Sequence, residues 1–392
     1  MSADDRWLLP EGVEEILPPE AHALEAMRRR LLDLFHGWGY EQVMPPLVEF
    51  LESLQTGLGQ DLDLQTFKLT DQLSGRLMGL RADMTPQVAR IEAHYLRRRG
   101  PVRLCYLGPV LRTRPGVFGA SREPLQLGAE LFGHPGPAAD AEVIELMARA
   151  LEAVGVGDLH LSLGHVGVYR ALAGAAGLPA PLEASVFDAL RRRSRPDLQA
   201  VIEAGGVAAP YDRLLPALLE LNGGPGVIDE ARAALAEGGE AAGPALDNLA
   251  AVVAQVGQVL PELRLYLDLA DLRGYRYHTG TVFSAYAPGS GQAIAHGGRY
   301  DDIGRAFGYA RPATGFSMDL RLVLRLAGTP PPLPGAILAP AELDTAGRAE
   351  VARLRAAGER VVAALPGAEA PAGCDRRLVR RDGRWQVLPL AG

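Results

Sequence analysis

Short strand-like segments bounded by turn residues occupy two separate parts of this 392-residue chain, and they restrict its fold more than any other feature. The first group includes RLMGLRAD, VRLCYLGPVLRTR and PLQLGAELFG; the second includes LRLYLDLADLRGY, YHTGTVFSAYAP and GFSMDL. Their spacing lacks the regular alternation with helices that a parallel sheet needs. The sequence therefore predicts an α+β fold built on an antiparallel sheet flanked by helices.

The stretch between the two groups has a different character. Residues 165–258 are rich in alanine and leucine at helical spacing and are interrupted by turns such as NGGPGV. We interpret this stretch as a helical insertion that splits one core into residues 1–164 and 259–327. A stiff proline-rich linker, 328–335, follows, and residues 336–392 have the pattern of a small C-terminal α/β appendage.

Charge and composition exclude several classes of function. The chain has 40 basic and 47 acidic residues, a net charge of −7, which disfavours a dedicated nucleic-acid-binding protein. Its basic runs, such as residues 191–195, are short and typical of a solvated helix face. No apolar run is long enough to span a membrane and the acidic N-terminus has no signal core, so we expect a cytoplasmic protein. Metal-ligand spacing and phosphate-binding loops are missing, which predicts neither metal nor cofactor.

Two segments combine polar side chains with features that suit a binding pocket. In LRADMTPQ, Asp83 and Thr85 precede a helix whose N-terminus can bind a carboxylate while the acid holds an ammonium. The same two residues can instead cap the helix, with Thr85 as the N-cap. In QLGAELFG, Gln126 and Glu130 share a strand face around Gly128, which fits either a pocket floor or a half-solvated sheet. Pattern alone leaves both interpretations open.

Further segments supply cationic and aromatic side chains. Arg112 stands at a strand end before a glycine-containing loop, where it can bind a phosphate or carboxylate, or face water. The segment LRGYRYHTGTVF contains Arg273, Tyr277 and His278 within six residues. Such a density of arginine, tyrosine and histidine indicates a binding wall rather than a surface strand.

In their order along the chain, these segments resemble the catalytic body of histidyl-tRNA synthetases, which are class II aminoacyl-tRNA synthetases. GYEQVMPPLVE is similar to the first class motif, VLRTRPGVFGASREPLQLGAELFG to the second, and GGRYDD with GFSMDLRLVLRL to the third. LRGYRYHTGTVF is similar to the histidine-specific segment. The resemblance implies the class II synthetase-like fold and a histidine-like ligand pocket. The residues implied to line that pocket are Asp83, Thr85, Arg112, Gln126, Glu130, Arg273, Tyr277, His278 and Tyr300.

The third motif lacks the arginine that clamps ATP in the synthetases. Leu322 occupies its position, and Arg321 is displaced by one helical step of about 100°. The pattern of this helix places Arg321 and Arg325 on a solvated face. Amino-acid activation puts negative charge on the α-phosphate, which preorganised cations must stabilise. We therefore expect no catalytic residues in this chain. Asp83 and His278 also replace the family's usual glutamate and tyrosine.

A synthetase body without its chemistry resembles the ATP phosphoribosyltransferase regulatory subunits of histidine biosynthesis. That resemblance implies a non-catalytic partner of the short-form catalytic subunit, needed for its activity in the first step and for feedback by free histidine. It implies a homodimer core within a hetero-octamer, without nucleic acid or membrane as a partner. Two alternatives remain open: an unusual histidyl-tRNA synthetase, or another synthetase-derived amino-acid ligase or binding module. Whether the pocket or a subunit interface would be the regulatory histidine site also remains open.

Overall fold

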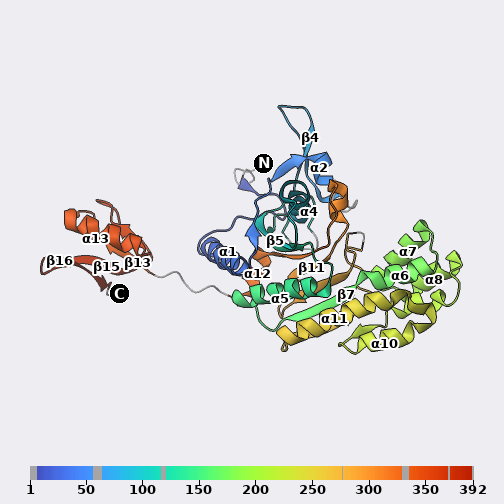
Figure 1. Ribbon diagram of the computed structural model, residues 1–392. Coiled ribbons are helices and arrows are strands. Elements are labelled where there is room, and N and C mark those ends of the chain that lie inside the picture. The colour runs from blue at the N-terminus through green and yellow to red at the C-terminus, as the bar shows by residue number, and fades with distance from the viewer. Residues whose placement is uncertain are drawn as a thin grey trace. The chain divides into compact units, whose positions relative to one another are not determined.

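The computed structural model describes residues 7–55, 64–115, 121–275, 277–328, 335–369 and 371–390. The chain forms two compact units that divide between Thr329 and Pro330, and each unit has a hydrophobic core of its own. Figure 1 shows the elements of both units, coloured along the chain. Most of the predicted linker 328–335 lies outside the described residues.

The first unit is organised around a nine-stranded sheet with the strand order β1-β5-β6-β12-β11-β10-β7-β9-β8. In chain order its strands are β1 (Glu41–Gln42), β5 (Val102–Pro109), β6 (Leu125–Phe132), β7 (His160–His165), β8 (Asn222–Gly223), β9 (Arg264–Asp268), β10 (Thr281–Tyr286), β11 (Ala295–Arg299) and β12 (Ala313–Asp319). Neighbours are antiparallel except β1 with β5 and β7 with β9. The predicted antiparallel sheet is confirmed, with two parallel pairings that the pattern did not indicate.

A three-stranded antiparallel sheet in the order β2-β4-β3 completes the strands of this unit. It consists of β2 (Val48–Phe50), β3 (Lys68–Thr70) and β4 (Leu77–Leu80). The segment EQVMPPLVEF is thus divided between two sheets, with β1 in the large one and β2 in the small one. Pro45 and Pro46 explain the division, because proline has no N–H to donate to a strand ladder.

Helices pack on both faces of the large sheet and form most of the chain between β7 and β9. They are α1 (Glu20–Gly37), α2 (Leu51–Gln55), α4 (Thr85–Arg90), η2 (Ile91–Leu96), α5 (Pro137–Ala153), α6 (Val166–Ala175), α7 (Ala180–Arg191), α8 (Arg195–Gly205), α9 (Tyr211–Ala217), α10 (Val227–Ala234), η3 (Ala236–Ala242), α11 (Gly243–Val259), η4 (Ile303–Phe307) and α12 (Leu320–Leu326). Among the described residues, none of these helices combines the length and apolar character that crossing a membrane requires.

The main core lies between the helices and the large sheet. In α1 the buried side chains Leu24, Met27, Leu31 and Phe35 recur every three or four residues, so they share one face of the helix. The Phe35 ring meets Phe316 of β12 edge-on, with ring centroids 6.0 Å apart. Helices α5 and α11 pack against each other along the strands (Figure 1). On the opposite face, Val88 of α4 and Ile303 of η4 pack with Leu104 of β5 in a second buried core, and polar side chains gather beside it.

The second unit is a four-stranded sheet, ordered β14-β13-β15-β16, with one helix. Its elements are β13 (Ala336–Ala339), α13 (Thr345–Ala356), β14 (Val361–Ala363), β15 (Cys374–Arg381) and β16 (Arg384–Pro389). Ile337 and Leu378 of the sheet are buried with Val351 and Leu354 of the helix in a small separate core. The C-terminal α/β appendage expected from the sequence is therefore present.

Candidate functional site

Polar side chains gather on the sheet face that lies opposite the main core. On β6, Gln126, Gly128 and Glu130 alternate with buried apolar residues, as period-two spacing predicts. Register places Tyr106 of β5 beside Gly128, and Gly315 of β12 beside Glu130. A Cβ atom at Gly128 would overlap the Tyr106 ring, and one at Gly315 would overlap the Glu130 carboxylate. The two glycines therefore provide the room in which a tyrosine and a glutamate lie over the sheet.

Glu130 is the centre of this arrangement. Its carboxyl group is fully buried and accepts hydrogen bonds from the Tyr106 hydroxyl, at 2.9 Å, and from the Tyr300 hydroxyl. Burial raises the pKa of Glu130 to about 8, although the two tyrosine hydrogen bonds act in the opposite direction. The Tyr106 bond ends on Oε1 and the Tyr300 bond on Oε2, so the two hydroxyls orient both carboxyl oxygens. The group can therefore hold or release a proton near neutral pH while it bonds a polar ring.

The start of α4 continues the network. The Asp83 Oδ1 atom accepts hydrogen bonds from the Thr85 N–H at 2.9 Å and from the Gln126 amide at 2.8 Å. The Thr85 and Tyr106 hydroxyls share a hydrogen bond of 2.8 Å. The predicted N-cap role of Thr85 is wrong, because α4 begins at Thr85 itself and Met84, in the cap position, makes no side-chain cap. The threonine hydroxyl serves the polar network instead of the helix end.

Aromatic rings close the network on its other side. The Tyr277 ring stacks on Tyr300, with centroids 5.0 Å apart, and His278 meets Tyr277 edge-on at 5.2 Å. Burial lowers the pKa of His278 to about 4, so its imidazole is neutral at pH 7. Within the described residues, the buried Tyr277 hydroxyl has no hydrogen-bond partner. Because such a group costs free energy when unpaired, it is a candidate contact for a ligand.

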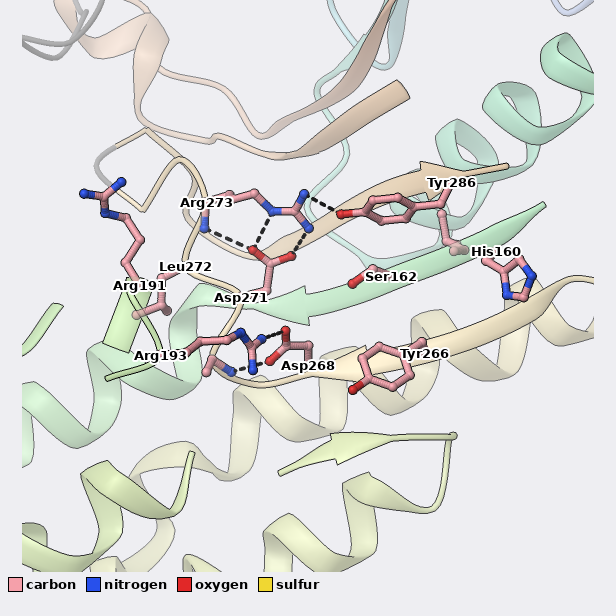
Figure 2. A pocket seen from close by; sticks show the side chains of 12 residues that line it. His160, Ser162, Arg191, Arg193, Tyr266, Asp268, Asp271, Leu272, Arg273 and Tyr286 are labelled. Carbon is pink, nitrogen blue, oxygen red and sulfur yellow. Dashed lines mark hydrogen bonds and ion pairs between the residues drawn. The ribbon is translucent and has the colours of Figure 1, made fainter. Parts of the chain in front are cut away.

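Two of the predicted site residues lie outside this network. The Arg273 guanidinium pairs with Asp271, with Nε 2.8 Å from Oδ1, and donates to the Tyr286 hydroxyl at 2.9 Å. Figure 2 shows these contacts in a separate cavity of about 520 Å³. Arg112 Nε donates to the Ala82 carbonyl at 3.3 Å. Hydrogen bonds and ring contacts thus connect Asp83, Thr85, Gln126, Glu130, Tyr277, His278 and Tyr300, but not Arg112 or Arg273, within the described part of the chain.

Two further residues, Tyr106 and His296, lie on the same face and were not predicted from the sequence. Tyr106 stands in VRLCYLGP as one of several apolar side chains, and its role depends on its register with Gly128. His296 of β11 pairs with Ser317 of β12, which in turn pairs with Gly128 of β6, so His296 lies on the same face. Desolvation lowers the pKa of His296, and the charges of nearby arginines contribute to the shift. The sequence signal that could have identified His296 is its alternating position in the strand, which places its imidazole on the same face as Glu130.

Leu322 is an apolar residue in apolar surroundings. Leu322 packs against the main core from α12. Arg321 does not lie on a solvated face as predicted, since only 13% of its side chain is exposed. Its guanidinium lies 3.5 Å from the Glu123 carboxylate and donates to the Glu14 backbone carbonyl at 3.3 Å. Neither side chain supplies an uncommitted cation to the sheet face.

Comparisons with known proteins agree with this description. The family profile described as histidyl-tRNA synthetase matches residues 12–323, and the profile described as ATP phosphoribosyltransferase subunit HisZ C-terminal domain matches residues 334–388. Two curated proteins named ATP phosphoribosyltransferase regulatory subunit, from Thioalkalivibrio sulfidiphilus and Ectopseudomonas mendocina, are 56% and 55% identical. Both alignments cover 100% of each chain.

Solved structures show the same relationship at the level of the fold. A Bacillus halodurans protein described as an ATP phosphoribosyltransferase regulatory subunit/histidyl-tRNA synthetase matches with a TM-score of 0.81 and 28% identity. The match covers 93% of this chain and 94% of that chain. A histidyl-tRNA synthetase from Nostoc shares the fold with a TM-score of 0.76 at 21% identity, over 95% and 91% of the two chains. The expected class II synthetase-like fold is confirmed.

Proposed function

Because this chain belongs to the ATP phosphoribosyltransferase regulatory subunits and so has a regulatory role in histidine biosynthesis, we propose that the Glu130 network is its histidine sensor. The chain would activate a short-form catalytic subunit and lower that activity when histidine binds. Histidine must then bind one quaternary state more tightly than the other, since only differential affinity shifts a population.

The buried, unpaired Tyr277 hydroxyl carries this proposal. The Tyr277 ring stacks on the Tyr300 ring, and the Tyr300 hydroxyl donates a hydrogen bond to Glu130. A polar ligand ring placed there would therefore meet the Tyr277 hydroxyl and the Glu130 carboxyl group. An imidazole has two ring nitrogens that a carboxyl group and a phenol can engage. A Glu130 pKa near 8 allows the site to take either protonation state of the ligand ring. Both observed bonds to Asp83 end on Oδ1, so a ligand ammonium can use Oδ2.

We also propose that the chain has no adenylation activity of its own. Leu322 places a hydrocarbon side chain where the synthetases have a cation, and Arg321 is committed to Glu123 and to a backbone carbonyl. Arg273 is likewise paired with Asp271. Arg112 is retained, but without the third-motif cation the developing charge on an α-phosphate would lose several kcal/mol of stabilisation. Histidine-dependent exchange of pyrophosphate with ATP would contradict this part of the proposal.

The assembly is proposed from the exposed first-motif segment. Met44 is 78% exposed and Leu47 is 41% exposed, on either side of Pro45 and Pro46. Large apolar side chains in such a position favour a protein interface. We propose that this segment forms the homodimer core, which joins the catalytic subunits in a hetero-octamer. Light scattering of the chain alone tests the mass of the homodimer. Light scattering of its mixture with the catalytic subunit tests the mass of the hetero-octamer.

The functional experiment combines the chain with a short-form catalytic subunit and follows phosphoribosyl-ATP formation with and without histidine. Activity should require the mixture and should fall as histidine rises. Glu130→Gln keeps the shape but removes the ionisable group, and Tyr277→Phe removes only the unpaired hydroxyl. Each should raise the half-inhibitory histidine concentration about tenfold or more, as expected for hydrogen bonds in a buried polar site.

The control is Glu203→Gln, on the exposed side of α8, which should leave the inhibition curve unchanged. If the mixture gains no activity over the catalytic subunit, the regulatory proposal fails. If activity appears but both pocket variants respond to histidine as the parent does, the sensor lies elsewhere, such as at a subunit interface.

A further inference from the structure

A second cavity lies on the same sheet face as the Glu130 network, toward the β9 edge. It measures about 520 Å³, within the range of roughly 300–1,000 Å³ that holds drug-sized ligands. Its charged and aromatic lining residues are His160, Arg191, Arg193, Tyr266, Asp268, Asp271, Arg273 and Tyr286. The described contacts of the Glu130 network reach only as far as Tyr277 and His278, so this cavity is separate from it.

Ion pairs hold two of the arginines in place. Arg193 binds the buried Asp268 carboxylate, and Arg273 binds the buried Asp271 carboxylate. Arg193 has a φ of +52°, a left-handed conformation that residues with a Cβ rarely adopt. The turn between α7 and α8 thus directs this guanidinium to the sheet. The basic run 191–195 was predicted to be a solvated helix face, and Arg193 departs from that prediction.

Arg191 remains available for a ligand. Its nearest described acid is Asp188, 3.6 Å away and one turn earlier on α7, and more than half of each side chain is exposed. Such a surface pair contributes little. In Figure 2 no contact joins Arg191 to Asp268 or Asp271. Arg193 and Arg273 are each paired with a buried aspartate, whereas the partner of Arg191 is the exposed Asp188, so Arg191 can exchange its partner for an anion.

Two phenol rings flank a small residue on the cavity floor. Ser162 of β7 lies directly beside Tyr266 of β9, and the next pair along β7 joins His160 to Tyr286 of β10. The Tyr266 hydroxyl donates to Asn222 at 2.6 Å, and the Tyr286 hydroxyl accepts from Arg273. Both rings are therefore held before any ligand arrives. Figure 2 shows Ser162 between them, which leaves open space above the strand.

We propose that this cavity binds a nucleoside monophosphate, with the phosphate on Arg191 and the base against the two tyrosine rings. A guanidinium binds phosphate oxygens in a bidentate manner, and phenol rings accept the flat face of a base. The paired arginines supply further positive potential without leaving their aspartates. This binding is a property of the chain alone and does not depend on the proposed histidine sensor.

The test is calorimetric titration of the full chain with adenosine monophosphate as the probe. Saturable binding to one site per chain is expected. Arg191→Glu should weaken it about tenfold or more, because it replaces a charge-assisted contact by repulsion. Ser162→Phe should abolish it by filling the cavity without changing its charge. Arg192→Glu is the matched control: Arg192 is the adjacent exposed arginine, pairs with Asp197 at 3.4 Å and does not line the cavity.

The Arg192 variant should bind as the parent does, and circular dichroism confirms that each variant is folded. Excess histidine should not displace the nucleotide, and inorganic phosphate should bind more weakly than the nucleotide. Four results would overturn the proposal: no binding up to about 10 mM, equal losses in the Arg191 and Arg192 variants, displacement by histidine, or phosphate binding as tight as the nucleotide. The first three leave the histidine-inhibition assay of the mixture unaffected, so the two proposals fail separately.

Discussion

The two ends of one sheet face differ in the physical means by which they hold polar groups. Around Glu130, a buried acid with a raised pKa is held by tyrosine hydroxyls, without an arginine bound to it. Around Arg273, guanidinium groups about half exposed to solvent are held by two buried aspartates. Both regions use the alternation of the same strands. The local chemistry, rather than the fold, thus decides what each region can bind.

The difference has a consequence for selectivity. A neutral acid among phenols can exchange a proton with its ligand, so it suits a ring that titrates near pH 7. Guanidinium groups stay positively charged throughout the physiological range, so the arginine cavity suits an anion. A single regulatory chain can therefore carry two sites on one surface without cross-reaction between their ligands.

The largest loss of stability is expected when the space that the Glu130 carboxylate occupies is filled by another group. Gly315→Ala places a methyl group on the Glu130 carboxylate, and overpacking of a buried site costs about 2–3 kcal/mol in the free energy of unfolding. Chemical denaturation measures this loss. Gly257→Ala in α11 is the control, since nothing lies within 4 Å of its new methyl group. It should stabilise the chain by up to about 1 kcal/mol, and equal losses in both variants would contradict the packing account.

A second experiment uses pH. The folded pKa of Glu130, about 8, lies above its ordinary value of 4.5, so the native chain keeps a proton that the unfolded chain loses. The stability contribution is complete below pH 4.5 and falls as pH rises toward 8, at about 1.4 kcal/mol per unit for one proton. Glu130→Gln should remove this slope. The measurement is the free energy of unfolding of the parent chain and of the Glu130→Gln variant from pH 5 to 8. If the two curves were parallel, Glu130 would be ionised in the folded chain and the prediction would be wrong.

The smallest expected effect belongs to the arginine cavity. Arg193→Ala leaves the buried Asp268 carboxyl without its cation, but solvent screens the half-exposed pair, so the loss should be about 1 kcal/mol. Arg195→Ala removes an exposed pair with Glu220 and should cost less than about 0.5 kcal/mol. Thermal unfolding of both variants compares them. A loss for Arg193→Ala as large as that for Gly315→Ala would mean that the two regions do not differ in burial as described.

Much of the fold follows from sequence periodicity. The alternation of β6 predicted this strand, and the apolar spacing of α1 is the corresponding signal for a helix, because each pattern reports one buried face. The same alternation placed Gln126 and Glu130 on one face of the strand, where the structure has them. Local patterns were sufficient where the pocket residues share one strand or one turn.

The remaining parts depended on contacts between distant segments. Tyr106 enters the site only because register sets it beside Gly128, and no local pattern contains that register. Arg273 turns to an acid two residues away, which the resemblance to a binding arginine did not indicate. Arg321 was predicted to be solvated, yet Glu123 and the backbone near Glu14 cover it. Side-chain direction was therefore harder to predict than strand position.

The strand order of the large sheet also determines how long β6 waits for its partner strand β12 during synthesis on the ribosome. Strand β6 ends at Phe132, which pairs with Ala313 of β12, so 181 residues separate the two partners. A ribosome adding about 5–20 residues per second needs roughly ten to forty seconds for that distance. Throughout this interval the inner edge of β6 has no native partner, and unpaired strand edges invite pairing with other chains. The nascent protein is thus most vulnerable to aggregation while its helical insertion is being made.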